Sequence, residues 1–300
     1  MITKDVETLA PAVPAPVAEE PGPRPRGTRR AWDEVPRWHI YLPLGLYLLF
    51  TLIPFYWILL FALRPAGSTS LVPWPMTFEH FDKVWTERSF GTYFQNSVLI
   101  AVTTLVMTTV VALAGGYALA RFDFKVKRAF MLALLCSQFV PGALLLVPLF
   151  QIFAKLQMIN SIASVVLAET VFQLPLSMIL ISGFIRNVPY SLEEAAWVDG
   201  CNRFSAFRII VLPLLRPGLI AVGSFAFVHA WNHFLFALMF LSNQDKQTLP
   251  VGLNTLMSSD SVDLGALAAG GIIAAVPVVI VFAFIQKWLI TGFSAGAVKG

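Results

Sequence analysis

Polar side chains that could hydrogen-bond a solute stand within otherwise apolar stretches of this sequence. Glu169 is a carboxylate well inside such a stretch, and Gln173 follows it at the spacing of one helical turn. Because an ionisable group within hydrocarbon must face water or protein, both residues are expected to line a polar pathway. The alternative is a structural hydrogen bond to a neighbouring helix, or protonation of Glu169 in place.

A second polar group falls in the apolar stretch that ends near residue 241. His229, Asn232 and His233 recur at helical spacing, so they share one face of a predicted helix. Two histidines four residues apart can hold a metal, but no third ligand has a suitable local spacing, so we expect no metal site. The face is expected either to line the pathway or to pack against another helix.

Gln138 is a further candidate for the pathway. It stands just before Pro141 and Gly142, a pair that predicts a break in the surrounding helix. Broken helices within a membrane line cavities where the freed backbone groups meet polar partners. Hydrogen bonding between helices is the alternative interpretation of Gln138.

The elements that must position these residues are predicted to be membrane-spanning helices. The 300-residue chain is 57% hydrophobic with a mean hydropathy of +0.73, more apolar than a soluble domain needs. A helix crosses the hydrocarbon core with about 20 apolar residues. Stretches of that length, none with the alternation of a barrel strand, are residues 38–63, 93–119, 130–153, 162–185, 217–241 and 264–290. The fold class is therefore all-α, with six transmembrane helices.

Basic residues are distributed unevenly between the two ends of these helices. Sixteen of the 21 Lys and Arg residues fall before the first span, after the last, and in the second-to-third and fourth-to-fifth connections. Cytoplasmic segments collect Lys and Arg, so both termini are predicted to be cytoplasmic. The net charge of +4 reflects this topology and does not indicate nucleic-acid binding. Residues 1–36 are predicted to be a disordered cytoplasmic tail, and residues 37–300 the membrane domain.

The connection between the fourth and fifth predicted spans, residues 187–217, is long and patterned. Ser191 followed by Glu193 and Glu194 predicts a capped helix start, and Gly200 predicts a left-handed helix end before a second amphipathic helix. Such a helix–turn–helix on the cytoplasmic side suits docking into a groove of another protein. An interfacial helix on lipid is the alternative, although its acids would be repelled by anionic headgroups.

One signature in this connection indicates a family. Glu194-Ala195-Ala196, Gly200 and Ile210-Val211-Leu212-Pro213 match the EAA-x3-G-x9-I-x-L-P signature of ABC importer permeases. Other motifs agree with it: Asn96-Ser97, Gly116-Tyr117-Ala118-Leu119-Ala120-Arg121, Trp231-Asn232, Thr248-Leu249-Pro250-Val251-Gly252 and Ala295-Gly296-Ala297-Val298-Lys299-Gly300. Residues 38–300 resemble the carbohydrate uptake family, most closely the smaller permease of maltose-type importers. In that family the position of His233 is often acidic, so this sequence departs from the pattern there.

The resemblance implies a type I importer fold in a bacterial inner membrane and a heterodimer with a second, related permease. It also implies two ATPase subunits, each gripping one EAA loop, and an extracytoplasmic binding protein that delivers a sugar. The residues expected to couple this chain to its ATPase are Glu193, Glu194, Ala195, Ala196, Trp197, Asp199, Gly200, Ile210, Leu212 and Pro213. Trp197 is expected either to fill a pocket of the ATPase or to pack back against the permease.

Two other classes of membrane protein compete with this interpretation. An ion-coupled secondary transporter also uses broken helices and a buried carboxylate, but the EAA loop argues against it. A membrane enzyme would need a nucleophile–base or H-E-x-x-H constellation, which the sequence lacks. The sequence has no G-x-x-x-x-G-K-[ST] phosphate loop, so ATP and Mg are expected on the partner ATPases and this subunit is not expected to be an enzyme.

Overall fold

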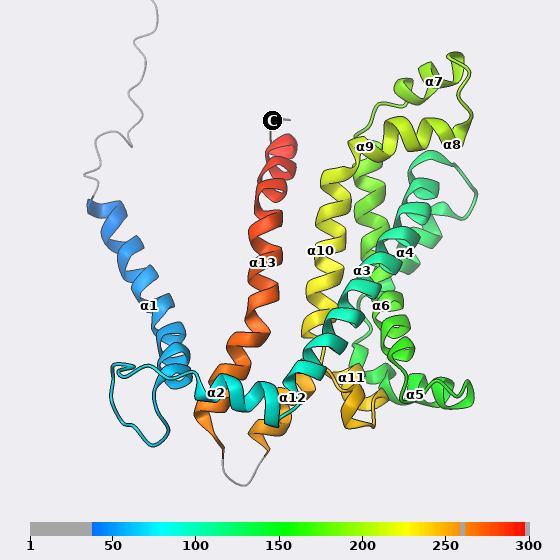
Figure 1. Ribbon diagram of the computed structural model, residues 1–300. Helices are drawn as coiled ribbons and strands as arrows, with labels where there is room; N and C mark the ends of the chain where they lie inside the picture. Colours follow the sequence, from blue (N-terminus) through cyan, green and yellow to red (C-terminus); the bar gives the residue numbers. More distant parts are fainter. Residues whose placement is uncertain (1–37, 259–261, 298–300) are drawn as a thin grey trace, which may run out of the picture. The chain divides into compact units, whose positions relative to one another are not determined.

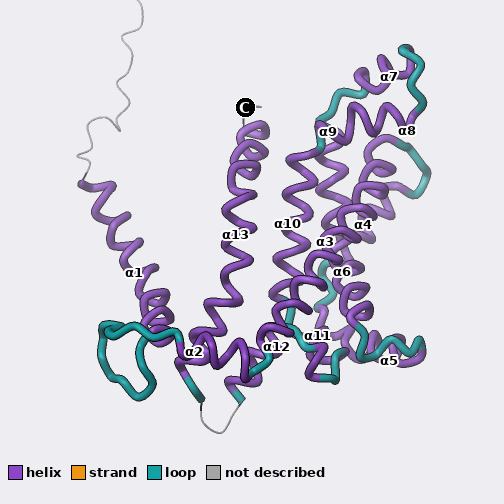
Figure 2. Tube along the Cα trace, viewed as in Figure 1, coloured by secondary structure: helices purple, strands orange, loops and turns teal. Residues whose placement is uncertain are grey.

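The computed structural model describes residues 38–258 and 262–297, with side chains described as far as residue 287. These residues form helices joined by turns and loops, and none of the described residues is in a strand (Figures 1 and 2). The predicted tail, residues 1–36, lies outside the described residues. The chain divides into two compact units, Met1–Ile53 and Pro54–Gly300, and all the candidate site residues belong to the second unit.

Four of the predicted spans are single helices. They are α1 (Trp38–Leu63), α3 (Phe90–Arg121), α6 (Ile162–Arg186) and α13 (Leu264–Ala297). Each is long and apolar enough to cross a membrane. Helices α1, α6 and α13 begin at the residues that the sequence predicted, because an uninterrupted apolar run defines both ends of a span.

The third predicted span is not one straight helix. Helix α4 (Lys127–Ser137) is followed by a 3₁₀ turn, η3 (Gly142–Leu145), and by α5 (Leu146–Lys155), and the two halves are bent by 94°. Pro141 causes the break, because it has no N–H to donate and disfavours a helical conformation of the residue before it. The predicted break at Pro141 is confirmed, and it turns the chain through nearly a right angle.

The fifth predicted span, residues 217–241, is also interrupted. Helix α10 (Arg216–Asn232) stops at His233, which has an extended backbone with φ −75° and ψ 122°, and a short helix, α11 (Leu235–Phe240), follows. No proline or glycine marks this break. Instead, the His233 ring lies 4.5 Å from the ring of Phe236 and its Nδ1 lies 2.8 Å from Glu169. We attribute the break to these tertiary contacts, which outweigh local helix propensity.

The first turns of α3 hold the segment that follows α11. That segment contains a 3₁₀ turn, η5 (Gln244–Lys246), and α12 (Leu249–Met257). The Asn96 amide donates to the backbone carbonyls of Asp245 and Gln247, each at 2.9 Å, and the Leu249 N–H donates to Ser97 Oγ at 2.8 Å. Two motifs that are about 150 residues apart therefore bind each other directly.

Helix α3 packs along α6 and α10, and glycines allow the helices to approach closely. A methyl group on Gly116 would lie 2.7 Å from Ile181 Cγ2 and 3.1 Å from the backbone nitrogen of Ser182. A methyl group on Gly218 of α10 would lie 2.6 Å from the Phe184 ring. Any larger residue would push the helices apart, so α3, α6 and α10 form a tightly seated core.

An ion pair joins the chain before α3 to the start of α13. Helix α2 (Glu79–Asp82) continues into a π-helical turn, η2 (Lys83–Glu87), and Lys83 Nζ lies 2.9 Å from Asp263 Oδ2. Asp263 also caps α13 by accepting a hydrogen bond from the N–H of Ala266 at 3.0 Å. Partial burial alone would raise the pKa of Asp263, but the Ala266 N–H and the Lys83 ammonium outweigh it and lower that pKa.

Candidate functional site

The predicted helix–turn–helix lies at the end of α3, α6 and α10 opposite α12 (Figure 1). Helix α7 (Ser191–Val198) is capped by Asp199, and the φ of +89° at the next residue, Gly200, confirms the predicted left-handed helix end. A methyl group on Gly200 would meet nothing within 4 Å, so conformation and not space requires glycine there. The chain continues as α8 (Arg203–Ala206), the π-helical turn η4 (Phe207–Val211) and α9 (Leu212–Leu214).

The predicted cap of α7 is wrong in detail. Ser191 is the first residue of the helix and not its cap, and the preceding residue, Tyr190, makes no side-chain capping bond. The Tyr190 carbonyl instead accepts from the N–H groups of Glu193 and Glu194, at 2.9 and 3.1 Å. The helix therefore begins by ordinary backbone bonding, because the chain enters it already in a helical conformation.

Helix α7 presents a polar and small-residue face to the outside. Glu194, Ala195 and Asp199 are exposed, and Val198 is 88% exposed. Ala196 is buried on the opposite face. Glu194 and Ala195, with the exposed side chain of Val198 one turn later, form a surface against which another protein could pack closely.

Glu193 differs from the role that the sequence predicted for it. Its carboxylate is fully buried, where Arg121 Nε donates to one oxygen at 2.6 Å and Tyr117 Oη donates to the other at 2.7 Å. Both donors belong to the last turn and a half of α3. Glu193 is therefore not free to pair with a basic group of another subunit, because its two oxygens are already bonded within this chain.

We call Tyr117, Arg121 and Glu193 the clasp. Arg121 also donates from Nη2 to the carbonyl of Val188 at 2.9 Å, and its guanidinium lies 5.3 Å from the ring of Tyr190. The arginine side chain is 9% exposed and the Glu193 side chain is fully buried, so this ion pair is shielded from solvent, whereas Tyr117 is partly exposed. Sequence reasoning noted Tyr117 and Arg121 only as parts of a motif; their i,i+4 spacing at the end of a span was the available signal.

Trp197 packs back against this chain, which was one of its two predicted roles. Its ring meets the Tyr190 ring edge-on at 5.7 Å, and the Arg203 guanidinium lies 5.2 Å from it. The ring is partly buried, and its Nε1 is buried with no hydrogen-bond partner in the described part of the chain. Trp197 thus joins α7 to α8.

The remaining signature residues lie in the second half of the helix–turn–helix. Ile210 and Leu212 are partly buried, and Pro213 is exposed. Between them, Val211 is fully buried against a core that includes Ile185 of α6. This half of the signature attaches the loop to the helix bundle, because Val211 packs into its core.

The second candidate cluster is formed by Glu169, His229 and His233, which we call the histidine cluster. His229 Nδ1 lies 3.0 Å from one oxygen of Glu169, and His233 Nδ1 lies 2.8 Å from the other, at an angle too poor for a formal hydrogen bond. The carboxylate is fully buried between α6 and α10, whereas the side chains of His229 and His233 are 51% and 22% exposed.

The expectation that Glu169 itself lines a pathway needs correction at this point. The carboxylate has no exposed surface in this chain, and its two oxygens contact imidazoles that are themselves partly exposed. Its hydrogen bond with His229 of α10 is the bond to a neighbouring helix that was the alternative interpretation of Glu169. His229 was expected to share one helix face with Asn232 and His233, but its contact with Glu169, 60 residues earlier in the sequence, was not predicted.

The other candidates lie close to this cluster and bond to backbone. Gln173 Nε2 donates to the Ala226 carbonyl of α10 at 3.4 Å, and Gln138 Nε2 donates to the Phe172 carbonyl of α6 at 3.3 Å. Asn232 is exposed, and its amide donates to the carbonyl one turn back in its own helix at 2.9 Å. Gln138 and Gln173 thus make the interhelical bonds that were their alternative interpretation.

The two broken helices meet beside the histidine cluster. The Phe236 ring lies 5.2 Å from the Phe172 ring and 4.5 Å from the His233 ring. A methyl group on Gly142, at the break between α4 and α5, would lie 3.4 Å from the Phe172 ring. The breaks at residues 138–142 and 233–234 are therefore linked through two phenylalanines to the polar cluster.

The described residues contain no group of three or more His, Cys, Asp or Glu side chains that could hold a metal ion. The histidine cluster supplies two imidazoles and one carboxylate, but each Nδ1 atom already contacts a carboxylate oxygen. Cys136 is exposed and Cys201 is partly buried, and both are free thiols.

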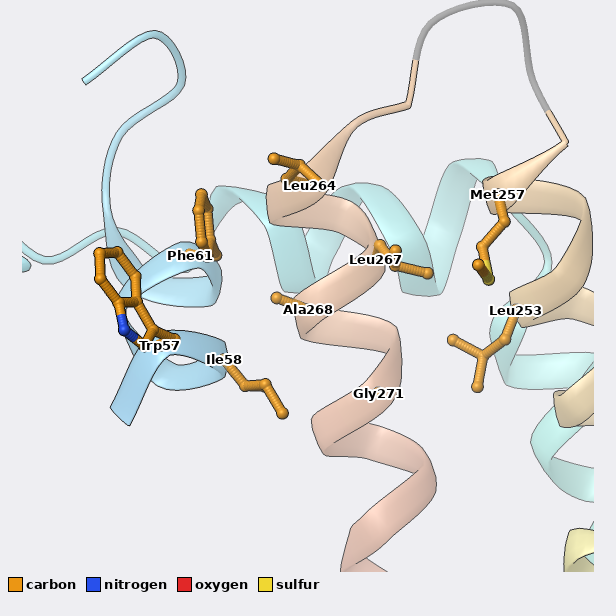
Figure 3. A pocket seen from close by; sticks show the side chains of 9 residues that line it. All are labelled: Trp57, Ile58, Phe61, Leu253, Met257, Leu264, Leu267, Ala268 and Gly271. Atoms are coloured by element: carbon orange, nitrogen blue, oxygen red, sulfur yellow. The ribbon is translucent and has the colours of Figure 1, made fainter. Parts of the chain in front are cut away.

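A separate pocket of about 470 Å³ is almost entirely apolar (Figure 3). It is lined by Trp57, Ile58 and Phe61 of α1, Leu253 and Met257 of α12, and Leu264, Leu267, Ala268 and Gly271 of α13. A polar solute bound there would lose its hydrogen bonds to water without replacement. This pocket is therefore not a candidate for the transport site.

The chain was compared with known protein families, proteins and solved structures. Residues 112–294 match the family described as binding-protein-dependent transport system inner membrane component. The diacetylchitobiose uptake system permease protein DasC of Streptomyces coelicolor is 35% identical over 276 residues, which cover 90% of this chain and 98% of that protein.

Solved structures with the same fold include a bacterial ABC transporter that imports the acidic polysaccharide alginate. It aligns with a TM-score of 0.71 at 20% identity over 82% of this chain and 94% of that one. A bacterial alginate transporter in complex with an alginate pentasaccharide-bound periplasmic protein aligns with a TM-score of 0.66 at 14% identity over 86% of this chain and 96% of that one. Since the family match covers more than half of the chain and a relative matches nearly its full length, this chain belongs to the family of binding-protein-dependent transport system inner membrane components.

Proposed function

We propose that this chain, with a second related permease, forms the pathway by which an ATP-driven importer takes a carbohydrate into a bacterial cell. Family membership makes it a multi-pass inner-membrane permease. The carbohydrate class is supported by the relative whose name assigns it diacetylchitobiose uptake. The supporting observation within the structure is the exposed face of α7, which carries Glu194 and Ala195 of the EAA signature.

Docking of a partner ATPase would use that exposed face. Glu194, Ala195 and Asp199 are available there, and Gly200 sets the turn that presents them. Glu194 and Asp199 would pair with basic groups of the ATPase, and the small side chain of Ala195 would allow close approach. ATP and Mg would then be bound by the ATPase, and both termini of this chain would lie on the same cytoplasmic side as α7.

The solute would pass the histidine cluster. With Glu169 ionised, the carboxylate only accepts, so His229 Nδ1 carries the hydrogen that it shares with Glu169. In the neutral imidazole the second ring nitrogen, Nε2, is then an acceptor, and in the imidazolium it is a donor. Sugar hydroxyls donate to such acceptors, and the exposed Asn232 one turn from His229 adds an amide. An extracytoplasmic binding protein would deliver the sugar, as the periplasmic protein bound in the alginate transporter structure suggests.

The importer hypothesis is tested with the complete complex, purified and reconstituted in vesicles. The binding protein is supplied on the side of the membrane opposite the ATPase. Sugar uptake should require both the ATPase and ATP. Uptake that continues on an ion gradient after the ATPase is omitted would support a secondary transporter instead.

The docking face is tested in the same complex by charge reversal. Glu194→Lys should release the ATPase during purification, whereas Glu79→Lys, an exposed acid in α2, should retain it. Normal recovery of the ATPase with Glu194→Lys would contradict docking on α7.

A further inference from the structure

Glu193 attaches α7 to α3 within this chain. Both of its carboxylate oxygens are bonded to α3, through Arg121 at 2.6 Å and Tyr117 at 2.7 Å. The carboxylate is fully buried, and removal of its cation would leave an uncompensated charge there. The attachment of α7 to α3 is therefore strong and does not depend on the covalent connections of the loop to α6 and α10.

Other contacts extend this attachment to both sides of α7. Arg121 holds the Val188 carbonyl, which lies just before the helix, at 2.9 Å. The Phe207 ring, which belongs to η4 after the helix, meets the Tyr117 ring edge-on at 5.0 Å. The last turns of α3 thus contact the chain before α7, α7 itself and the chain after it, so the whole loop is bound as one body.

The other end of α3 holds a different segment. Asn96 and Ser97 bind residues 245–249, and a methyl group on Gly252 of α12 would lie 2.4 Å from the Tyr93 ring. Helix α3 is continuous over 32 residues, about 48 Å at the helical rise. It therefore connects the loop at one end of the bundle directly to the segment 245–252 at the other.

We infer that α3 is the element that carries movement of α7 to the opposite end of the molecule, and that Tyr117 and Arg121 are positioning residues for this coupling. The inference rests on the proposed docking of an ATPase on α7. A ligand-driven movement shifts the permease only if the moved element has different contacts in the two states. The clasp makes α3 move with α7, so the segment 245–252 receives the same displacement.

The test uses the reconstituted importer and measures sugar molecules imported per ATP hydrolysed. Glu193→Gln weakens the clasp but leaves the exposed face of α7 intact, whereas Glu194→Gln weakens that docking face and leaves the clasp intact. Glu79→Gln, at an exposed acid of α2, is the matched control. Arg121→Gln combined with Glu193→Gln removes both charges, so no unpaired charge remains buried if the single variant fails to fold. In both clasp variants the ATPase should still co-purify while import per ATP falls about tenfold, within the range of ordinary allosteric coupling.

A distance measurement separates coupling from general damage. In a background with Cys136→Ser and Cys201→Ser, spin labels at Ser191→Cys and Phe122→Cys, both exposed, report the separation of α7 from the end of α3. That distance should stay constant with and without trapped ATP in the native clasp and should become variable in the double variant.

Unchanged import per ATP in the double variant would overturn the inference. So would release of the ATPase by Glu193→Gln but not by Glu194→Gln, because Glu193 would then be a docking residue. Failure of the unmodified complex to import sugar with ATP would instead contradict the proposed function, so the two failures are distinguishable.

Discussion

The histidine cluster and the clasp each bury a carboxylate completely, but they surround it with different partners. Glu193 is paired with a guanidinium that is 9% exposed, whereas Glu169 is paired with two imidazoles, one of which is 51% exposed. Arginine stays charged under all ordinary conditions, so the guanidinium of the clasp keeps its charge. Imidazoles can donate, accept and change protonation, and here they reach the surface. The comparison separates a carboxylate that fixes two helices from one that orients groups toward a solute.

Removing the cation from the clasp should have the largest effect. Arg121→Met leaves the buried Glu193 unpaired, which costs about 3–5 kcal/mol. Local opening of α7 should become at least roughly 100-fold more frequent, since each 1.4 kcal/mol is about a tenfold change. Hydrogen exchange of peptides covering residues 187–200 measures this opening directly.

The matched control for the clasp is the Lys127–Asp123 pair at the same end of α3. That pair is 3.0 Å long, but its aspartate side chain is 99% exposed. Lys127→Met should therefore change stability by less than about 1 kcal/mol. Equal effects of Arg121→Met and Lys127→Met would show that burial does not distinguish the clasp.

Changes in the histidine cluster should affect transport more than assembly. Glu169→Ala, His229→Ala and His233→Ala each remove part of a charged hydrogen-bonding group worth about 1.5–3 kcal/mol, so uptake should fall roughly tenfold to 100-fold. The complex should still purify with its ATPase. The control is His39→Ala in α1, a histidine stacked on Trp38 outside the cluster, which should import at the normal rate.

Loss of the assembled complex in all three cluster variants, with no separate effect on uptake, would break the comparison. Glu169 would then be a structural anchor of the same kind as Glu193. A graded result would sharpen the comparison, because His229 is more exposed than His233 and should influence uptake more.

The smallest effect is expected at the Lys83–Asp263 pair, whose side chains are 36% and 34% exposed. Because the pKa of Asp263 is lowered in the folded chain, its charge stabilises the fold above about pH 3.9 and the contribution is lost as the pH falls further. Lys83, whose pKa is raised by its hydrogen bond to Asp263, remains charged throughout this range.

Asp263→Asn keeps an oxygen to cap α13 and removes only the charge. At pH 7 it should lower stability by less than about 1 kcal/mol, since exposed pairs are weak. Thermal unfolding of the purified protein at pH 7 and at pH 3.5 measures the difference from the unmodified chain. A difference that grows as the pH falls would be the wrong sign for a lowered aspartate pKa.

Part of this structure could be predicted from the sequence because its signals are local. Apolar runs placed α1, α6 and α13, Pro141 marked the break before η3, and Gly200 marked the end of α7. Each of these depends on residue type within a few positions.

The pairings of the two buried carboxylates could not be predicted in the same way. Glu193 was assigned to another protein because its partner, Arg121, lies 72 residues earlier. The break at His233 has no local cause and follows from contacts with Glu169 and Phe236. A contact between residues that are far apart in the sequence, such as Glu193 and Arg121, cannot be predicted from local residue spacing.

The bonds between α3 and the segment after α11 also bear on how the chain is made. The partners of Asn96 lie 149 and 151 residues further along the sequence. At about 5–20 residues per second, a ribosome needs roughly 6–25 s to reach them after α3 has been synthesised. During that interval Asn96 and Ser97 have none of these partners. Helix α3 therefore completes its hydrogen bonds to residues 245–249 only after the penultimate span has been synthesised. Completion of the bundle is therefore a late event of biosynthesis, and a chain released before residue 245 would present this polar edge to any factor that recognises unassembled membrane helices.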